Sequence, residues 1–196
     1  MTLNKFEIQV GLKAIEQSDN ISIDAIRIPF NNFKEDRILA EQKGWEKNRV
    51  VLELVTPQDY QTTCGNRVFF TKPSEDIAAF KMNFPDIEVG AAAFTIADCK
   101  NLELAKVDYI QYDISGSNLS KSIESIPDLK SLLSRESEYG WDLLSLNTPV
   151  LIGNVKGLDQ FTDIFNQADI KGLVLDDWNE DSKELILRIR QLTGDI

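Results

Sequence analysis

The sequence contains no histidine among its 196 residues. This absence excludes Ser-His-Asp and Cys-His nucleophiles, imidazole general bases and the usual zinc ligand sets. Any proton transfer would have to use aspartate, glutamate, lysine, tyrosine or cysteine side chains. A metal site would be rich in oxygen ligands, so Mg²⁺ is the one cofactor that the composition suggests.

Cysteine is scarce as well, with only Cys64 and Cys99, and neither belongs to a C-x-x-C pair. Two isolated cysteines are typical of buried, reduced thiols, so we expect a cytoplasmic protein. No apolar run approaches the length that spans a membrane, and residues 1–5 do not resemble a signal segment. We therefore expect no membrane association.

Positive charge is in deficit, because 21 lysines and arginines face 32 aspartates and glutamates, for a net charge of −11. Nucleic-acid binding requires clustered lysine and arginine, and no basic stripe is visible, so we expect no nucleic-acid partner. The acidity favours solubility. The expected partner is a small-molecule ligand, and a homodimer is left open beside a monomer.

The sequence does contain a pattern of short apolar run, loop and helical stretch, repeated about eight times. Helical segments are expected at 12–17, 33–43, 95–104, 158–165 and 183–192, with another after Pro73 and barely one turn at 58–65. The expected strands are 6–10, 24–28, 49–55, 67–70, 87–90, 107–112, 149–153 and 172–175.

Strands that alternate with helices imply parallel pairing, because parallel strands need a crossover connection. Eight such units predict an α/β fold, a (β/α)8 TIM barrel formed by residues 1–196 as a single domain. Apolar runs such as Val50-Val51-Leu52 suit strands that are covered on both sides. An open doubly wound sheet is the alternative, but its G-x-G-x-x-G signature after the first strand is absent.

Active sites of such barrels lie at the carboxyl ends of the strands. The second strand ends near Arg27 and the third carries Glu53, which places both side chains at a similar depth on neighbouring strands. We interpret Arg27 as a ligand-binding cation and Glu53 as a catalytic carboxylate that orients it. The alternative is a self-contained buried ion pair.

The last three strands end in further polar residues. Gln111 and Asp113 share one face of the sixth strand. Gln111 is a predicted ligand-binding residue, and Asp113 a predicted general base or Mg²⁺ ligand, unless it only caps the following turn. Gly153 and Asn154 end the seventh strand as predicted ligand-binding residues. Asp176 ends the eighth as a second predicted metal ligand.

Two loops next to these strand ends have opposite character. The loop 115–121 is small and polar, and its hydroxyl and N–H groups, with Ser120 and Lys121 as predicted ligand-binding residues, suit a phosphate. A plain surface loop is the alternative. The segment 176–181 is acidic and would repel an anion unless Mg²⁺ intervenes, and it could equally serve to cap the last helix.

Four segments resemble motifs of one known family. Residues 87–95 followed by Val107–Ile110 read as strand, turn and helix ending in D-Y-I. Ser117–Lys121 is a serine-containing loop that ends in lysine, and Ile152–Val155 is a glycine turn after a strand. In these segments, and in Ile26-Arg27, the chain resembles thiamine phosphate synthase and the TenI-like barrels.

The resemblance implies a (β/α)8 barrel and, if active, a transferase. It implies that Arg27 and Lys121 hold a pyrophosphate and that Gly153 lets a phosphate approach. The sequence departs from the family where Ala91-Ala92-Ala93 replaces a polar turn and where Asn154 replaces a glycine. The resemblance therefore indicates a diverged member.

Three functions follow from these observations, and whether the chain is an enzyme is left open. The first is a diverged thiamine-phosphate-synthase-like barrel that binds a small anionic or phosphorylated ligand at the carboxyl-terminal mouth. The second is a non-catalytic barrel that serves as a binding or interaction module. The third is a Mg²⁺-dependent lyase or isomerase built on Glu53, Asp113 and Asp176.

Overall fold

The computed structural model describes residues 6–17, 23–60, 65–113, 146–153, 170–176 and 178–194. The predicted helix at 158–165 and the polar loop at 115–121 lie outside these residues. Cys64, Ser120, Lys121 and Asn154 also lie outside them, as does the side chain of Asp113.

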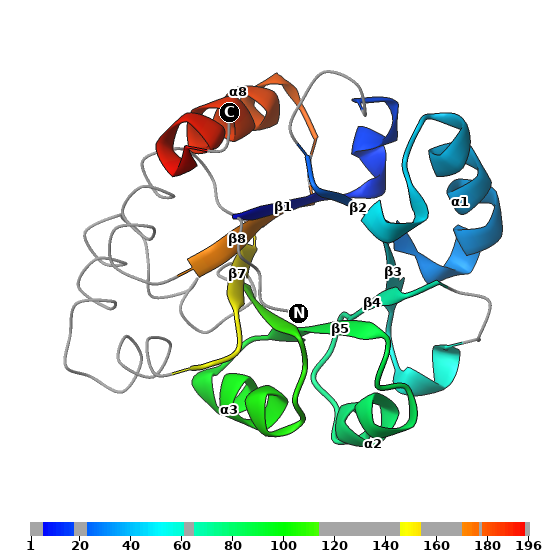
Figure 1. Cartoon of the computed structure of the whole chain (residues 1–196), viewed down its shortest axis with the longest axis vertical. Coiled ribbons are helices and arrows are strands. Elements are labelled where there is room, and N and C mark those ends of the chain that lie inside the picture. The colour runs from blue at the N-terminus through cyan, green and yellow to red at the C-terminus, as the bar shows by residue number, and fades with distance from the viewer. Residues whose placement is uncertain are drawn as a thin grey trace.

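Eight parallel strands close into a barrel in the order in which they occur in the chain (Figure 1). This confirms the predicted barrel and excludes the open sheet. The strands are β1 (Glu7–Val10), β2 (Ala25–Pro29), β3 (Val50–Leu54), β4 (Arg67–Phe70), β5 (Glu88–Ala93), β6 (Tyr109–Asp113), β7 (Val150–Gly153) and β8 (Ile170–Leu175).

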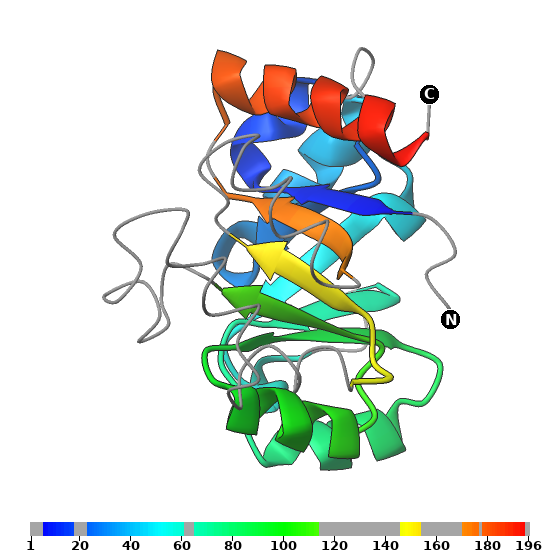
Figure 2. The same ribbon diagram turned by 90° about the vertical axis from the view of Figure 1, so that its left-hand side faces the viewer.

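Helices lie on the outside of the barrel and cover the outward faces of the strands (Figure 2). Two connections contain 3-10 helix in place of an α-helix, at Leu12–Gln17 and Pro57–Asp59, and 3-10 turns at Phe30–Asn32 and Lys47–Arg49 flank the helix between β2 and β3. The α-helices among the described residues are α1 (Phe33–Gln42), α2 (Asp76–Asn83), α3 (Ile96–Leu104) and α8 (Glu180–Thr193). No helix in this part of the chain is long and apolar enough to cross a membrane.

The unit after β3 has the short helical segment that the sequence predicts, a single 3-10 turn at Pro57–Asp59. Pro57 takes the first position of the turn, where its missing N–H costs nothing. The backbone N–H of Thr56 donates to Asp59 Oδ2 at 2.8 Å and so caps the turn.

Strand boundaries differ from the prediction most at β5, which continues to Ala93 instead of ending at Gly90. Three consecutive alanines have low strand propensity, so the sequence alone favours a turn there. In the barrel, Ala91, Ala92 and Ala93 are at most 4% exposed and pair with residues 110–112 of β6. Burial between neighbouring strands therefore outweighs the local preference.

The outward-facing side chains of the strands form the main apolar core beneath the helices. The barrel interior, in contrast, contains polar as well as apolar side chains. Four polar side chains are buried there: Glu7, Gln9, Arg27 and Gln111. A smaller apolar cluster completes the filling and consists of Ala25, Val51, Phe69, Ala92, Tyr109, Leu151 and Val174. These four polar side chains must therefore pair with one another or bind a ligand inside the barrel.

Tyr109 fills the middle of the barrel because Gly90, its partner in register on β5, has no side chain. A Cβ atom at Gly90 would lie 2.1 Å from Cζ of Tyr109. The tyrosine ring is 1% exposed and stacks on Phe69, with 6.3 Å between the ring centroids.

We expect Gly90→Ala to lower the free energy of unfolding by about 1–3 kcal/mol, the usual cost of overpacking a core. Adding Tyr109→Val removes the clashing ring, so the double variant should lose less stability than the sum of the two single variants. Tyr109→Phe keeps the ring and should give no such relief. Urea unfolding of the wild type, the three single variants and the two double variants measures this, and strictly additive losses for Gly90→Ala with Tyr109→Val would contradict the steric explanation.

The free thiol of Cys99 is buried on α3, and burial raises its pKa to about 12. A thiol with this pKa is almost entirely protonated at neutral pH and is a poor nucleophile. This agrees with the structural role expected for it.

Candidate functional site

Arg27 is the central charged group near the carboxyl-terminal mouth of the barrel. β2 directs it inward, where it is 1% exposed. Its Nε donates to Gln9 Oε1 at 2.7 Å, and its Nη1 donates to Gln111 Oε1 at 2.5 Å. Its Cζ lies 3.7 Å from the centroid of the Phe69 ring. Side chains from β1, β4 and β6 therefore hold the guanidinium in one orientation.

Glu53 lies beside Arg27, as the strand ends predict. Its Oε1 is 3.7 Å from Nη1 of Arg27, a distance for an ion pair and too long for a hydrogen bond. The side chain of Glu53 is 22% exposed, whereas that of Arg27 is 1% exposed. Glu53 therefore stands between the buried cation and the solvent.

Burial raises the pKa of Glu53 above its ordinary value, against the opposing effect of the Arg27 charge. The negative charge of Asp176 raises it further. Asp176 itself is exposed after the last residue of β8. A carboxyl group with a raised pKa is better suited to proton transfer near neutral pH than an ordinary one.

The raised pKa of Glu53 predicts a specific pH dependence of stability. The folded state holds the Glu53 proton more tightly than the unfolded state, so the free energy of unfolding should fall as pH rises from about 4.5 through the folded pKa. Glu53→Gln removes this contribution. Its stability relative to the wild type should therefore increase with pH across this window and then level off, as measured by urea unfolding at several pH values. A constant difference would contradict the shift.

Gly153, a predicted ligand-binding residue, has a structural reason to be glycine. A Cβ atom there would lie 2.5 Å from Nε2 of Gln111. The missing side chain thus leaves room for the amide that accepts from Arg27. The phosphate approach predicted for Gly153 is a separate hypothesis, and the described residues do not bear on it.

A pocket of about 360 Å³ opens beside Glu53 at the carboxyl ends of β2, β3 and β4. Its wall combines apolar and small polar side chains with the Glu53 carboxylate: Pro29, Phe30, Asn31, Leu54, Val55, Thr56, Asp59 and Thr71. Its size suits a small molecule. Glu53 therefore lines this pocket on one side and pairs with the buried Arg27 on the other.

The metal prediction rests on Asp113 and Asp176. Within the part of the chain that the structure describes, no group of three or more potential ligands is close enough to hold a metal ion. Asp113 ends β6 opposite Gly153 in the strand register, but its side chain is outside the described set. The assignment of Mg²⁺ to these residues stays a prediction.

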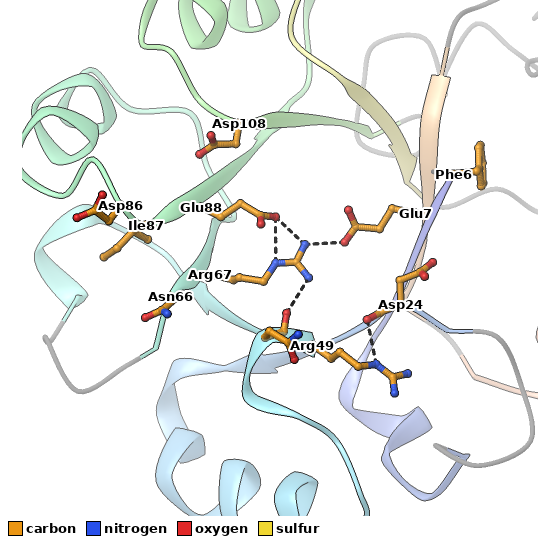
Figure 3. A pocket seen from close by; sticks show the side chains of 11 residues that line it. Phe6, Glu7, Asp24, Arg49, Asn66, Arg67, Asp86, Ile87, Glu88 and Asp108 are labelled. Carbon is orange, nitrogen blue, oxygen red and sulfur yellow. Dashed lines mark hydrogen bonds and ion pairs between the residues drawn. The ribbon is translucent and has the colours of Figure 1, made fainter. Parts of the chain in front are cut away.

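The sequence reading missed a second set of charged residues, at the amino-terminal end of the barrel. Arg67 on β4 donates through Nη2 to Oε1 of both Glu7 and Glu88, each at 2.6 Å (Figure 3). Gln9 Nε2 also donates to Glu7 Oε1, at 3.0 Å, and Gln9 in turn accepts from Arg27. A continuous chain of hydrogen bonds therefore runs through the barrel from Arg67 to Arg27.

The alternation Phe6-Glu7-Ile8-Gln9-Val10 was the available signal for this set. Alternation usually indicates a strand with one face in water. In a closed barrel the polar face is the interior, and both Glu7 and Gln9 are at most 5% exposed.

Comparisons with known proteins agree with this geometry at the level of the fold. No family model matches the chain, and a search of curated proteins finds no relative. Among solved structures, thiamine phosphate pyrophosphorylase from Pyrococcus furiosus is similar, with a TM-score of 0.67 and 13% identity over 98% of each chain.

Two further structures share the fold at similarly low identity. Dihydropteroate synthase from Thermus thermophilus has a TM-score of 0.60 and 12% identity, over 100% of this chain and 94% of its own. An aldolase/citrate lyase family protein from Burkholderia cenocepacia has a TM-score of 0.60 and 10% identity, over 97% and 94%. The chain thus shares the (β/α)8 barrel fold of these proteins, and the resemblance to thiamine phosphate synthase barrels is confirmed for the fold.

Proposed function

We propose that this chain binds a small anionic ligand, phosphorylated or carboxylated, at the carboxyl-terminal mouth of the barrel. One observation carries the proposal: Nη2 of Arg27 is buried and has no hydrogen-bond partner. The nearest carboxylate, that of Glu53, is 3.7 Å from the other amino group and is not hydrogen-bonded to it. A buried guanidinium in this state lacks an anionic oxygen, and a ligand oxygen would satisfy it.

The surrounding residues define how the ligand would bind. Gln9 and Gln111 keep the guanidinium rigid, so little side-chain entropy is lost on binding. Because Arg27 is buried, the anion reaches it only when the partly exposed Glu53 turns aside. The 360 Å³ pocket next to Glu53 would hold the rest of the ligand.

The finer form of the proposal is a diverged thiamine-phosphate-synthase-like transferase. In that form Ser120, Lys121, Gly153 and Asn154 complete the anion site around Arg27. The fold shared with thiamine phosphate pyrophosphorylase supports this form without establishing its substrate.

The proposal includes Mg²⁺ at the carboxylates of the mouth. The negative charge of Asp176 acts on Glu53 there and contributes to its raised pKa. Mg²⁺ is commonly held by one or two carboxylates together with phosphate oxygens of the substrate. Asp113 and Asp176 would hold the ion, which would shield a phosphorylated ligand from the acidic rim.

A lyase or isomerase that uses carboxylates is the second candidate, and the raised pKa of Glu53 favours it. In this candidate Glu53 accepts or donates the proton and Arg27 stabilises the negative charge that develops on the substrate. Location in the cytoplasm and the homodimer stay predictions.

Anion binding is tested by titrating inorganic phosphate and pyrophosphate, with and without Mg²⁺, and following the melting temperature. In the absence of Mg²⁺, Glu53→Gln should tighten binding about tenfold or more, because it removes a negative charge close to the anion. Arg27→Gln should abolish binding. Glu41→Gln, on the exposed surface of α1, is the matched control and should change nothing.

Two results would contradict the proposal. Binding of neither anion under any condition would leave the non-catalytic module as the better description. Binding that Glu53→Gln and Glu41→Gln leave equally unchanged would place the anion elsewhere on the molecule.

A further inference from the structure

A second pocket, of about 500 Å³, opens at the amino-terminal end of the barrel, opposite the mouth (Figure 3). We call it the amino-terminal pocket. The residues of its wall that carry the argument are Glu7, Asn66, Arg67, Asp86, Ile87 and Glu88. It lies at the other end of the hydrogen-bond chain that leads from Arg67 through Glu7 and Gln9 to Arg27.

Glu7 supplies the observation that points to a ligand. Its side chain is about nine-tenths buried or more, at 5% exposure. Oε1 accepts from Gln9 and from Arg67, whereas Oε2 is buried and has no hydrogen-bond partner. Figure 3 shows the carboxylate directed into the space between Arg67 and Glu88. A buried carboxylate oxygen without a donor is costly, so this position lacks an N–H group.

The cations around the pocket are bonded to other groups. Arg67 uses Nε and Nη2 for Glu88 and Glu7, and its Nη1 donates to the carbonyl of Asn48 at 3.3 Å. Lys81 donates to Asp108 and to the carbonyl of Ile87. None of the described side chains therefore supplies the missing donor.

Arg49 and Arg190 also donate their hydrogen bonds to other groups. Arg49 donates to the carbonyls of Ile23 and Asp24. Arg190 donates to Asp24 and to the carbonyl of Phe6. None of these four cations therefore donates to Glu7 Oε2, which keeps no hydrogen-bond partner in the structure.

The chemistry of the wall selects the class of ligand. An anion is excluded because Glu7, Glu88 and the exposed Asp86 would repel it. A bare metal ion lacks the three ligands it needs among the described residues. Phe6 and Ile87 add apolar surface on opposite sides of the charged residues (Figure 3).

We propose that the amino-terminal pocket binds an organic cation, with a primary ammonium group on Glu7 Oε2 and an alkyl chain along the pocket wall. The ammonium group provides N–H donors, and a donor is what Glu7 Oε2 lacks. The proposed ligand is therefore an aliphatic amine or diamine.

The probe is 1,4-diaminobutane, titrated into the whole protein by calorimetry at low ionic strength, with 1-butanol as the uncharged comparison. We expect saturable binding of one diamine and no binding of butanol. Glu7→Gln keeps the oxygen that accepts from Arg67 and Gln9 but removes the charge, and should weaken diamine binding about tenfold or more. The remote variant Glu41→Gln should bind like the wild type.

A second variant decides the question if Glu7→Gln does not fold. Asn66 is exposed on the pocket wall, and Asn66→Lys would tether an ammonium group there, so it should block the diamine and raise the melting temperature. No saturable binding to the wild type up to about 10 mM would overturn the proposal. So would equal affinity of the wild type and Glu7→Gln, or full diamine binding by Asn66→Lys.

Discussion

Replacing Arg67 by methionine should lower the free energy of unfolding by about 3–5 kcal/mol, one of the largest losses expected for a single change in this protein. Arg67 is 12% exposed and bridges Glu7 and Glu88, which are 6% and 17% exposed. Without it, two largely buried carboxylates lose their shared cation. Urea unfolding at neutral pH measures the loss.

The loss should also depend on pH. Burial already raises the pKa of Glu88, and the Arg67 charge opposes this effect. Without Arg67 the folded pKa of Glu88 rises further, so the folded variant gains stability relative to the wild type as pH falls through that pKa. The difference between the two proteins should therefore shrink in mild acid.

Arg37→Met provides the matched control for Arg67→Met. Arg37 pairs with Glu41 on the surface of α1, where the two side chains are 25% and 41% exposed, so its loss should cost about 0–1 kcal/mol. A similar small cost for both arginines would show that the bridge between β1, β4 and β5 does not stabilise the barrel.

Replacing Arg27 by methionine should cost about 3 kcal/mol of stability and remove anion binding. Methionine fills a similar volume, but the side-chain oxygens of Gln9 and Gln111 lose their donor in the barrel interior. Glu53 loses its counter-charge at the same time. Thermal and urea unfolding, together with a phosphate titration, measure both effects.

A triple variant separates the structural role of Arg27 from its binding role. Combining Arg27→Met with Gln9→Met and Gln111→Met replaces the partners as well, and removing both sides of a buried hydrogen bond is often nearly neutral. This protein should regain most of the lost stability and still fail to bind phosphate. Recovery of binding along with stability would show that Arg27 does not contact the anion.

The mouth of the barrel could be predicted because strand ends can be counted. Once eight strands are assigned, Arg27 and Glu53 fall at the carboxyl ends of neighbouring strands, and the structure brings them within 3.7 Å. The same counting places Gln111 and Asp176 at strand ends. Counting could not show that Gln111 contacts Arg27, because that contact joins β2 to β6 across the barrel and 84 residues of sequence.

The amino-terminal set could not be predicted, for a physical reason. Polar residues at alternate positions of a strand indicate a solvent-facing side in an open sheet and an interior side in a closed barrel. Glu7 and Gln9 carry that pattern, and its meaning depends on closure. Arg67 adds to the difficulty because its partner Glu7 is 60 positions away.

By itself the sequence determined the parallel barrel, since the repeated alternation of strand and helix is a local property of the chain. It also excluded imidazole chemistry, since there is no histidine. The tertiary structure alone decided which polar side chains meet. Closure and strand register set the distances inside the barrel, and these distances leave Arg27 Nη2 and Glu7 Oε2 without partners at its two ends.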